Sequence, residues 1–176
     1  MAEVHIIGQI IGGRSFPSKS IFCRWGIWAG SGWKLIEGLK EGQTQVDSPV
    51  LDDISFWCHP IDVHFAVKSL QGWPKLHLQV YHLDEFGRIE IFGYGFIHIP
   101  SSPGVHEISC LTWRPAAASL LQKLRRFFLG GGPYLRNPDL VLSSAERYRL
   151  RTESMGEVYV ELGVILRNFQ TFGVEV

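Results

Sequence analysis

The sequence lacks an excess of charge of either sign. Its 17 lysine and arginine residues balance 17 aspartate and glutamate residues, so the formal net charge at pH 7 is zero. Proteins that bind nucleic acids non-specifically carry a basic excess that neutralises phosphates, so the composition argues against a nucleic-acid partner. A chain with no net charge and many aromatic side chains also favours association over a highly soluble monomeric state.

Cysteine is scarce as well. The chain has three cysteines, Cys23, Cys58 and Cys110, which are far apart and form no C-x-x-C motif. A disulfide framework or a zinc knuckle needs paired spacing, so we expect reduced thiols of the kind found inside proteins of a reducing compartment.

Long apolar runs are also missing. The short apolar run at the N-terminus is flanked by Glu3 and His5 and broken by Gly8, unlike the long apolar region of a signal peptide. No segment approaches the ~20 apolar residues of a membrane span. Ala2 stands where N-myristoylation requires glycine. We therefore expect a cytosolic protein without a membrane anchor.

What the sequence does contain is short runs of alternating apolar and polar residues. These runs predict strands over 4–11, 21–28, 33–36, 61–68, 76–81, 89–99, 106–111 and 158–166. With 176 residues, of which 45% are hydrophobic, the chain suits one single-core domain over residues 1–176. About eight short strands favour an all-β fold, an antiparallel β-sandwich.

One hairpin, over residues 72–106, is the most distinctive stretch. Its turn carries the acidic pair Asp84 and Glu85 before Gly87, and a Gly-Tyr-Gly at 93–95 interrupts its second strand. Glycine in a strand marks a bulge or a close approach of another backbone. Either the core bends at these glycines or a partner comes close to them.

One segment has helical rather than strand periodicity. From Pro115 to Leu129 the apolar residues recur at helical spacing, with proline at the start and Gly130-Gly131-Gly132 after the end. We predict one amphipathic helix inserted between strands. Its face bearing Lys123, Arg125 and Arg126 could contact an acidic partner or an anionic membrane, or could simply be solvated.

The best candidate for metal chemistry is the segment from His59 to His64. On a strand, Asp62 and His64 share a face and could bind one ion, with a third ligand from His77, His82, His98 or His106. The alternative is that these are solvent-facing polar residues. The chain has no HExxH or G-x-S-x-G motif, and its acidic loops, with Asp47, Asp52 and Asp53 in one, lack the D-x-D spacing of a calcium loop. We therefore predict no catalytic residue, metal ion or cofactor.

The aromatic content is more informative. The chain has six tryptophans, eleven phenylalanines and five tyrosines. Five of the tryptophans lie beside predicted turns or strand ends: Trp28, Trp33, Trp57, Trp73 and Trp113. Aromatic residues in such places are candidate anchors of a protein interface, although packing at the edge of the core explains any single one equally well.

Several long runs resemble a known family. They are GQTQVD (42–47), HPIDVHFAVKSLQGWPKLHLQVYHLDEFGR (59–88), GYGFIHIPSSPGVH (93–106), CLTWRP (110–115), FFLGGGP (127–133) and LRNFQTFGVEV (166–176). The sequence is similar to the B9 domain family over essentially its whole length. This resemblance implies a divergent C2-like β-sandwich that is not an enzyme and carries no catalytic residue.

The resemblance also implies partners and a location. Family members assemble as B9 domain-containing protein 1, the Meckel syndrome type 1 protein and a third B9 protein within the tectonic-like complex. That complex acts as a diffusion barrier at the ciliary transition zone and basal body and is needed for ciliogenesis. The expectation is a non-enzymatic scaffold protein of the cytoplasm and cytoskeleton. A peripheral membrane-binding C2-like domain, calcium-independent, is the second hypothesis, and a metal-dependent jelly-roll enzyme using Asp62 and His64 is the third.

Overall fold

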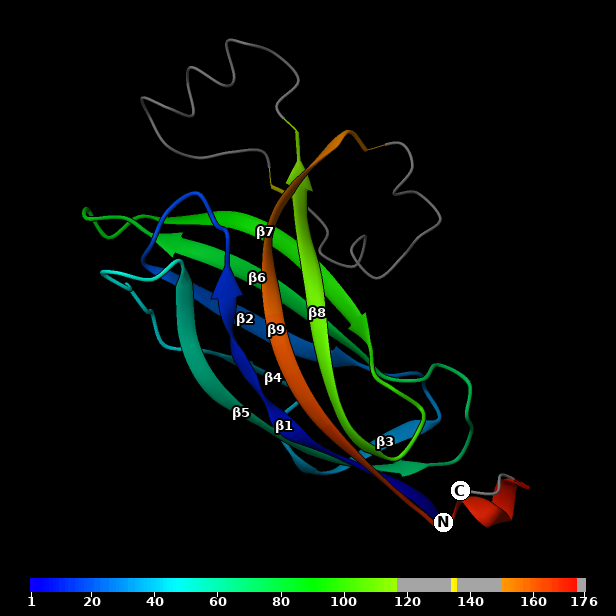
Figure 1. Ribbon diagram of the computed structural model, residues 1–176. Coiled ribbons are helices and arrows are strands. Elements are labelled where there is room, and N and C mark those ends of the chain that lie inside the picture. The colour runs from blue at the N-terminus through cyan, green and yellow to red at the C-terminus, as the bar shows by residue number, and fades with distance from the viewer. Residues whose placement is uncertain (117–133, 136–149, 174–176) are drawn as a thin grey trace.

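The computed structural model describes residues 1–116, 134–135 and 150–173, which form strands and one short 3₁₀ turn (Figure 1). The elements are β1 (Ala2–Arg14), β2 (Ile21–Trp28), β3 (Trp33–Gly38), β4 (Glu41–Gln43), β5 (Ile54–Val67), β6 (Lys75–Leu83), β7 (Ile89–His98), β8 (Gly104–Pro115), β9 (Thr152–Arg167) and η3 (Phe169–Phe172). No helix within these residues is long and apolar enough to cross a membrane.

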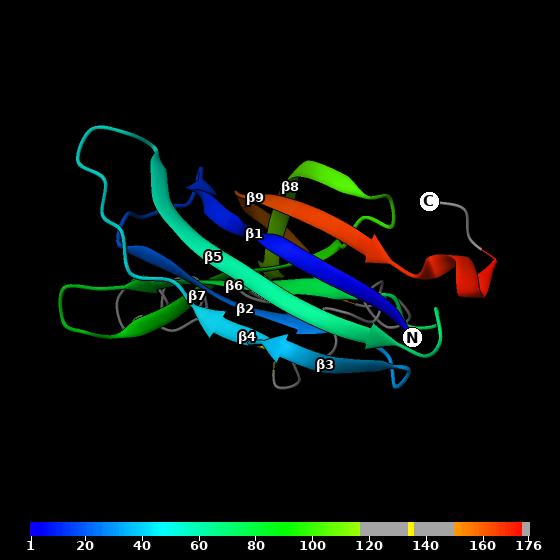
Figure 2. The ribbon, with the colours of Figure 1, turned by 90° about the horizontal axis from the view of Figure 1, so that it is seen from below.

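The strands form one antiparallel sheet that curls into two facing layers. Its order is β3-β5-β1-β9-β8-β7-β6-β2-β4. Figure 2 shows β5, β1 and β9 in one layer and β2, β6 and β7 in the other. The layers meet where β7 and β8 share the single pair Tyr94–Trp113. The predicted all-β antiparallel fold is confirmed, with nine strands in the described residues.

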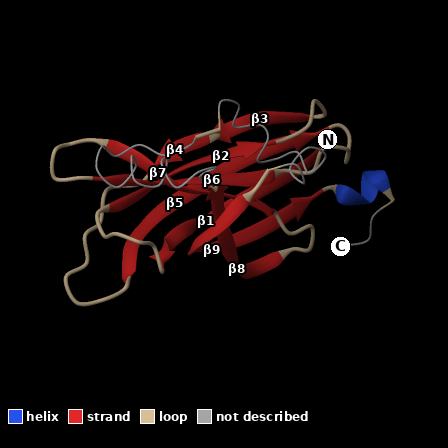
Figure 3. Ribbon diagram, turned by 90° about the horizontal axis from the view of Figure 1, so that it is seen from above, coloured by secondary structure: helices blue, strands red, loops and turns tan. Residues whose placement is uncertain are grey.

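The other side of the sandwich is closed by one stretch of chain. β3 pairs with β5 at one end of the sheet, and β4 pairs with β2 at the other end, although only residues 39–40 separate them. The N–H of Ile27 donates to the carbonyl of Lys40 at 2.7 Å, so the chain crosses from one layer directly to the next. Most described residues lie in strands, and the helical turn lies beside the C-terminus (Figure 3).

The alternation of apolar and polar residues explains which side chains form the core. Leu76, Leu78 and Val80 of β6 are fully buried, and so are Val160 and Leu162 of β9, while their sequence neighbours are only partly buried. Each strand thus contributes every second side chain to the space between the layers. Burial of this apolar surface, at about 25 cal/mol per Å², is the main force that holds the layers together.

Six of the eight predicted strands are longer than the sequence predicts, whereas β2 has the predicted bounds and β7 ends one residue earlier, at His98. β5 begins at Ile54 and continues through Pro60, which lies opposite Gln9 beside a register shift in β1. Proline is tolerated there because it lies beside an irregularity in the ladder. β4 was missed because its residues, EGQ, show no alternation, and it pairs with β2 over three residues only.

The predicted start of the helix at Pro115 is wrong. Pro115 ends β8 and pairs with Thr152, and Ala116 donates its N–H to the carbonyl of Arg151 at 2.8 Å. Pairing with β9 therefore overrides the helix-start signal of proline. Residues 117–129 of the predicted helix, including Lys123, Arg125 and Arg126, lie outside the described residues.

The glycines at 93–95 allow β8 to approach β7. A Cβ added to Gly93 would lie 2.6 Å from Oγ1 of Thr112, and one added to Gly95 would lie 2.6 Å from Sγ of Cys110. The hydroxyl of Thr112 is itself buried and donates to the carbonyl of Gly156 at 2.7 Å. The sequence leaves open a bend in the core or the approach of a partner. The structure shows a register shift of β7 beside Gly93 and the approach of β8 of the same chain.

Candidate interaction surface

The outer face of β2, β6 and β7 carries a ladder of aromatic side chains. We call this surface the aromatic face, and it comprises Phe22, Trp28, Lys75, His77, Tyr81, Tyr94, Phe96 and His98. The register of the three strands places these residues in rows: Trp28, Lys75 and His98 in one row, and Phe22 with Tyr81 in another. Rings that lie directly opposite each other on neighbouring strands are close enough to stack. Phe22 and Tyr81 stack with their ring centroids 5.4 Å apart.

One end of the aromatic face is covered by the chain itself. Tyr94 and Trp113 are buried there and their ring centroids lie 5.8 Å apart. Leu135 packs against this pair and donates its backbone N–H to the Tyr94 hydroxyl at 3.0 Å. Burial raises the pKa of Tyr94 above its ordinary value, although the Leu135 hydrogen bond lowers it in part. This end is therefore part of the fold.

The other end is open to solvent, and we call it the Trp28 patch: Trp28, Lys75, Phe96 and His98. Trp28 is 45% exposed and His98 is exposed. The ammonium of Lys75 lies 5.9 Å from the Trp28 ring centroid and 6.0 Å from that of Phe96. A cation near two aromatic rings, one of them an exposed tryptophan, is a combination typical of the anchor residues of protein interfaces.

The other four tryptophans proposed from the sequence are more buried: Trp33, Trp57 and Trp73 pack into or against the core between the layers, and Trp113 is buried beside Tyr94 on the aromatic face. Trp33, Trp57 and Trp113 are 5%, 2% and 6% exposed, and Trp73 is half-buried against the core. The indole N–H of Trp57 donates to the Ile21 carbonyl at 3.1 Å, and that of Trp73 to the Ile99 carbonyl at 2.8 Å. Trp33, Trp57 and Trp113 therefore offer little exposed surface, whereas Trp28 is 45% exposed. A role of the four in an interface stays a prediction, and Trp28 is the candidate taken further.

Sequence reasoning missed Lys75, Phe96 and His98. Their positions follow from cross-strand pairing, which brings Lys75 opposite Trp28 on one side and His98 on the other. The sequence could have indicated them through the alternate residues of β6 and β7 that face outward, combined with the strand register set by the hairpin turn.

Asp62 and His64, the pair considered as a candidate metal site, are engaged in other contacts. Asp62 accepts a hydrogen bond from His5 at 2.7 Å, and His64 lies 3.4 Å from a carboxylate oxygen of Glu3. The rings of His5 and His64 stack at 4.9 Å on the outer face of β1 and β5. Among the described residues no group of three or more histidine, cysteine, aspartate or glutamate side chains could hold a metal ion.

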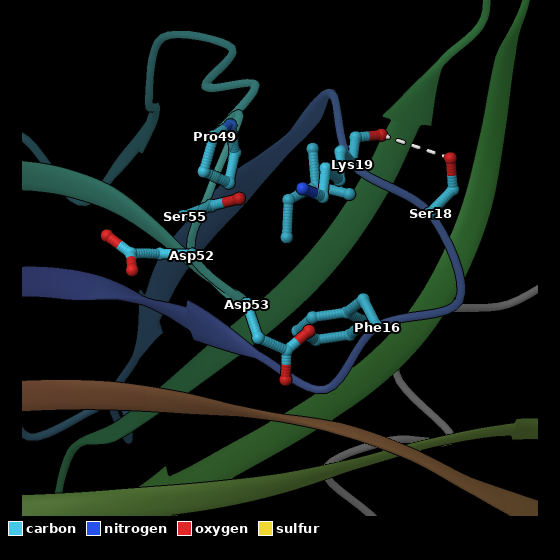
Figure 4. Close-up of a pocket in the computed structure, with 8 residues that line it drawn as sticks. Phe16, Ser18, Lys19, Pro49, Asp52, Asp53 and Ser55 are labelled. Atoms are coloured by element: carbon cyan, nitrogen blue, oxygen red, sulfur yellow. Dashed lines mark hydrogen bonds between the residues drawn. The ribbon is translucent and has the colours of Figure 1, made fainter.

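Three loops meet at one end of the sandwich, and we call this the loop end: residues 15–20, 47–53 and 84–88. Figure 4 shows the residues that line a pocket between the first two loops, with Phe16, Ser18 and Lys19 on one side and Pro49, Asp52, Asp53 and Ser55 on the other. The volume of this pocket is about 20 Å³. A neighbouring open pocket of about 340 Å³ adds Asp84, Glu85 and Arg88 of the third loop. The tips carry exposed apolar residues: Val50 is 86% exposed, Leu51 94% and Phe86 82%.

Two carboxylates at the loop end accept hydrogen bonds from the backbone of their own segments. Asp47 accepts the N–H of Phe56 at 2.8 Å, and Asp84 accepts the N–H groups of Phe86 and Arg88 at 2.9 and 2.7 Å. Partial removal from water raises the pKa of Asp84, but these bonds and the Arg88 guanidinium lower it further, so the net pKa lies below its ordinary value. Asp84 thus caps its own turn, as the sequence predicts for this position.

Comparison with known proteins gives a consistent result over almost the whole chain. A family model described as "Ciliary basal body-associated, B9 protein" matches residues 4–165. The chain is 58% identical over 175 residues to B9 domain-containing protein 2 of Danio rerio and 56% identical to that of Homo sapiens, in each case over 99% of both chains. It is 31% identical to B9 domain-containing protein 1 of Mus musculus, over 97% of this chain and 84% of that protein. Among solved structures, the C2A domain of plant extended synaptotagmin 1 is similar at a TM-score of 0.46 and 13% identity, covering 93% of each chain.

Proposed function

The chain belongs to the B9 domain family, and we propose that it is a non-enzymatic interaction module of the ciliary transition zone that binds other B9-domain proteins. The observation that carries this proposal is the extent of the match, 99% of both chains at up to 58% identity. The whole curled sheet, as one B9 domain, is therefore what the relatives share, and we assign the function to the surfaces of that sheet.

The partners we propose are B9 domain-containing protein 1 and the Meckel syndrome type 1 protein, within the tectonic-like complex. The 31% identity to B9 domain-containing protein 1 of Mus musculus supports a complex of related domains. The location proposed is the cytoplasm and cytoskeleton at the basal body and transition zone, in agreement with the family description as basal body-associated. There the complex would contribute to the diffusion barrier and to assembly of the cilium.

The surface we propose for one of these contacts is the Trp28 patch. It offers an exposed indole, a second ring and a cation within 6.0 Å of both. Aromatic and cationic side chains carry a large share of the free energy in protein interfaces, because they bury much area with little loss of side-chain entropy.

Co-purification tests the proposal. The chain is co-expressed with B9 domain-containing protein 1 and with the Meckel syndrome type 1 protein, singly and together, and a stable complex with at least one of them is expected. Trp28→Ser should weaken binding at least about tenfold, as removal of an anchor residue does. The matched control is Ile36→Ser, which removes a 51% exposed apolar side chain from β3. If the chain forms no complex with B9 domain-containing protein 1 and none with the Meckel syndrome type 1 protein, the proposal is contradicted.

The apolar tips of the loop end favour a second candidate function, peripheral membrane binding that does not need calcium. Leu51 and Phe86 come from loops far apart in sequence, yet both loops contribute to pockets that share Ser18 and Lys19. Exposed apolar tips at one end of a domain, with Lys19 and Arg88 behind them, suit shallow insertion between lipid headgroups.

Sedimentation with vesicles separates the two candidates. The purified chain is mixed with phosphatidylcholine vesicles with and without phosphatidylserine, each with calcium or with a chelator. If the chain binds membranes, the wild type should pellet with vesicles in the absence of calcium. The double variant Leu51→Ser/Phe86→Ser should then stay in the supernatant. If the wild-type chain stays in the supernatant with every vesicle, the membrane function is excluded and the scaffold function stands unaffected.

A further inference from the structure

One long strand edge of the sandwich has no partner strand. β8 pairs with β9 along its whole length, from Gly104 opposite Val164 to Pro115 opposite Thr152. On its other side, within the described residues, β8 pairs with β7 only at Trp113, and it also contacts β7 at Cys110, whose Sγ donates to the Phe96 carbonyl at 3.6 Å. Figure 2 shows β8 at the outer end of its layer, beyond β9. We call residues 104–111 the β8 edge.

The β8 edge lacks the usual protection of an exposed strand. Its eight residues, GVHEISCL, contain no proline, lysine or arginine, which are the residues that commonly block pairing at an edge. The two ends of the sheet are blocked differently: β4 has three residues only, and the chain between β3 and β4 crosses to the other layer. In an antiparallel ladder every second residue directs its N–H and C=O away from the existing neighbour, so about four residues of the β8 edge offer both groups to an added strand.

The outer side chains of the β8 edge have a distinctive pattern. Val105 is 72% exposed and Leu111 is 66% exposed, and both lie on the outer face of the sheet with Glu107 between them. An added strand would cover part of these large, exposed apolar side chains and remove their surface from water. The inner side chains Ile108 and Cys110 pack toward the core and fix the phase of the strand.

The charge on this face is unbalanced. Glu107 lies directly opposite Glu161 of β9 in the register, and both side chains are on the outer face. Two like charges at opposite positions of neighbouring strands destabilise the pair. Neither carboxylate has an ion-pair partner in the part of the chain that the structure describes. A basic side chain on an added strand, opposite Glu107, would relieve this repulsion.

We propose that the β8 edge is the site where a second B9-type domain adds an extended strand to this sheet, with a basic side chain opposite Glu107 and apolar side chains opposite Val105 and Leu111. This inference rests on the proposed function and gives it a location distinct from the Trp28 patch. Main-chain hydrogen bonds to β8 supply affinity in this mode, and the alternate side chains supply specificity.

Three variants of the chain test this site in complex with B9 domain-containing protein 1 of Mus musculus. Glu107→Lys reverses the charge that the added strand needs and should raise the dissociation constant at least about tenfold. In the free chain the same change places a cation opposite Glu161, so the melting temperature should not fall. Val105→Lys/Leu111→Lys should weaken binding similarly. Ile7→Lys, at a 42% exposed position on the same outer face but on the interior strand β1, is the matched control and should bind as the wild type does.

Amide hydrogen exchange provides the second readout. Amides in residues 104–111 should exchange more slowly in the complex than in the free chain, because an added strand hydrogen-bonds them. Wild-type affinity in Glu107→Lys, or unchanged exchange over 104–111 in a complex that forms, would overturn this inference and leave the proposed function intact. If the wild-type chain forms no complex, the proposed function fails and this inference fails with it.

Discussion

The three cysteines differ sharply in their surroundings. Cys23 and Cys110 are buried, whereas Cys58 is exposed on β5 with a backbone φ of 45°. Burial raises the pKa of the Cys23 thiol to about 12, so this thiol stays protonated and unreactive at neutral pH. All three cysteines are free thiols, as the sequence predicts.

Thiol reactivity tests this assignment. We predict that one thiol, that of Cys58, reacts with a thiol reagent in the folded chain and that all three react after denaturation in guanidinium. Cys58→Ser should remove the reaction of the folded chain altogether. Rapid reaction of two or three thiols under native conditions would show that Cys23 or Cys110 is accessible.

The same pKa predicts a loss of stability at alkaline pH. The folded-state pKa of Cys23 is raised, so its contribution is fully present below the unfolded value of 9.0 and is lost as pH rises toward about 12. Urea unfolding of the wild type should therefore show a lower free energy of unfolding at about pH 10.5 than at pH 8. In Cys23→Ala this difference should shrink. An equal decrease in both proteins would assign the alkaline loss to other groups.

At the scale of the element, the contact between β7 and β8 holds the two layers together. The space for β8 depends on glycines at 93 and 95, where a Cβ would meet Thr112 or Cys110. A strand interior normally disfavours glycine, so its use here reflects the need for a close approach.

A double-mutant cycle measures this contact. Gly95→Ala should destabilise the chain by about 1–3 kcal/mol, because its Cβ would overlap the Cys110 sulfur. Cys110→Ala removes that sulfur, so the double variant should be more stable than the sum of the two single changes predicts. Additive changes in the free energy of unfolding would show that the two side chains do not share this space.

The acidic loops and the His59–His64 segment are not expected to bind a metal ion. Asp47 and Asp84 are occupied by backbone N–H groups, and Asp62 by His5. A metal ion would have to break these bonds, so neither calcium, zinc nor a chelator should shift the melting temperature of the purified chain. A rise in melting temperature that saturates with added calcium or zinc would reveal a site that this account excludes.

At the scale of the whole molecule, the sequence predicts the strands but not their closure. The alternation of Leu76, Leu78 and Val80 is local and predicts β6 correctly. The pairing of β1 with β9, which are separated by most of the chain, depends on long-range packing that no local pattern contains. For the same reason the sequence could not distinguish Trp57, whose indole reaches Ile21 across the core, from Trp28, which faces solvent. In the sequence both tryptophans lie beside a turn or strand end, and only the curl of the sheet buries Trp57 and leaves Trp28 exposed.

The candidate surface shows the same limit. Trp28 was identified because aromatic residues at strand ends suit interfaces, whereas Lys75 and His98 join it only through the register of three strands. His5 contacts Asp62 for a similar reason, although 57 residues separate them in sequence. Interfaces and clusters built from several strands therefore become visible only once the register is known.

The stoichiometry and affinity of one complex show whether this chain binds another B9 domain. Sedimentation velocity of the purified chain, mixed with increasing amounts of B9 domain-containing protein 1 of Mus musculus, measures both. We predict a one-to-one complex that forms with the wild-type chain and is weakened in Glu107→Lys but not in Ile7→Lys. Two species that sediment independently at every ratio, with both proteins folded, would contradict the assignment of this chain as a module that binds other B9 domains.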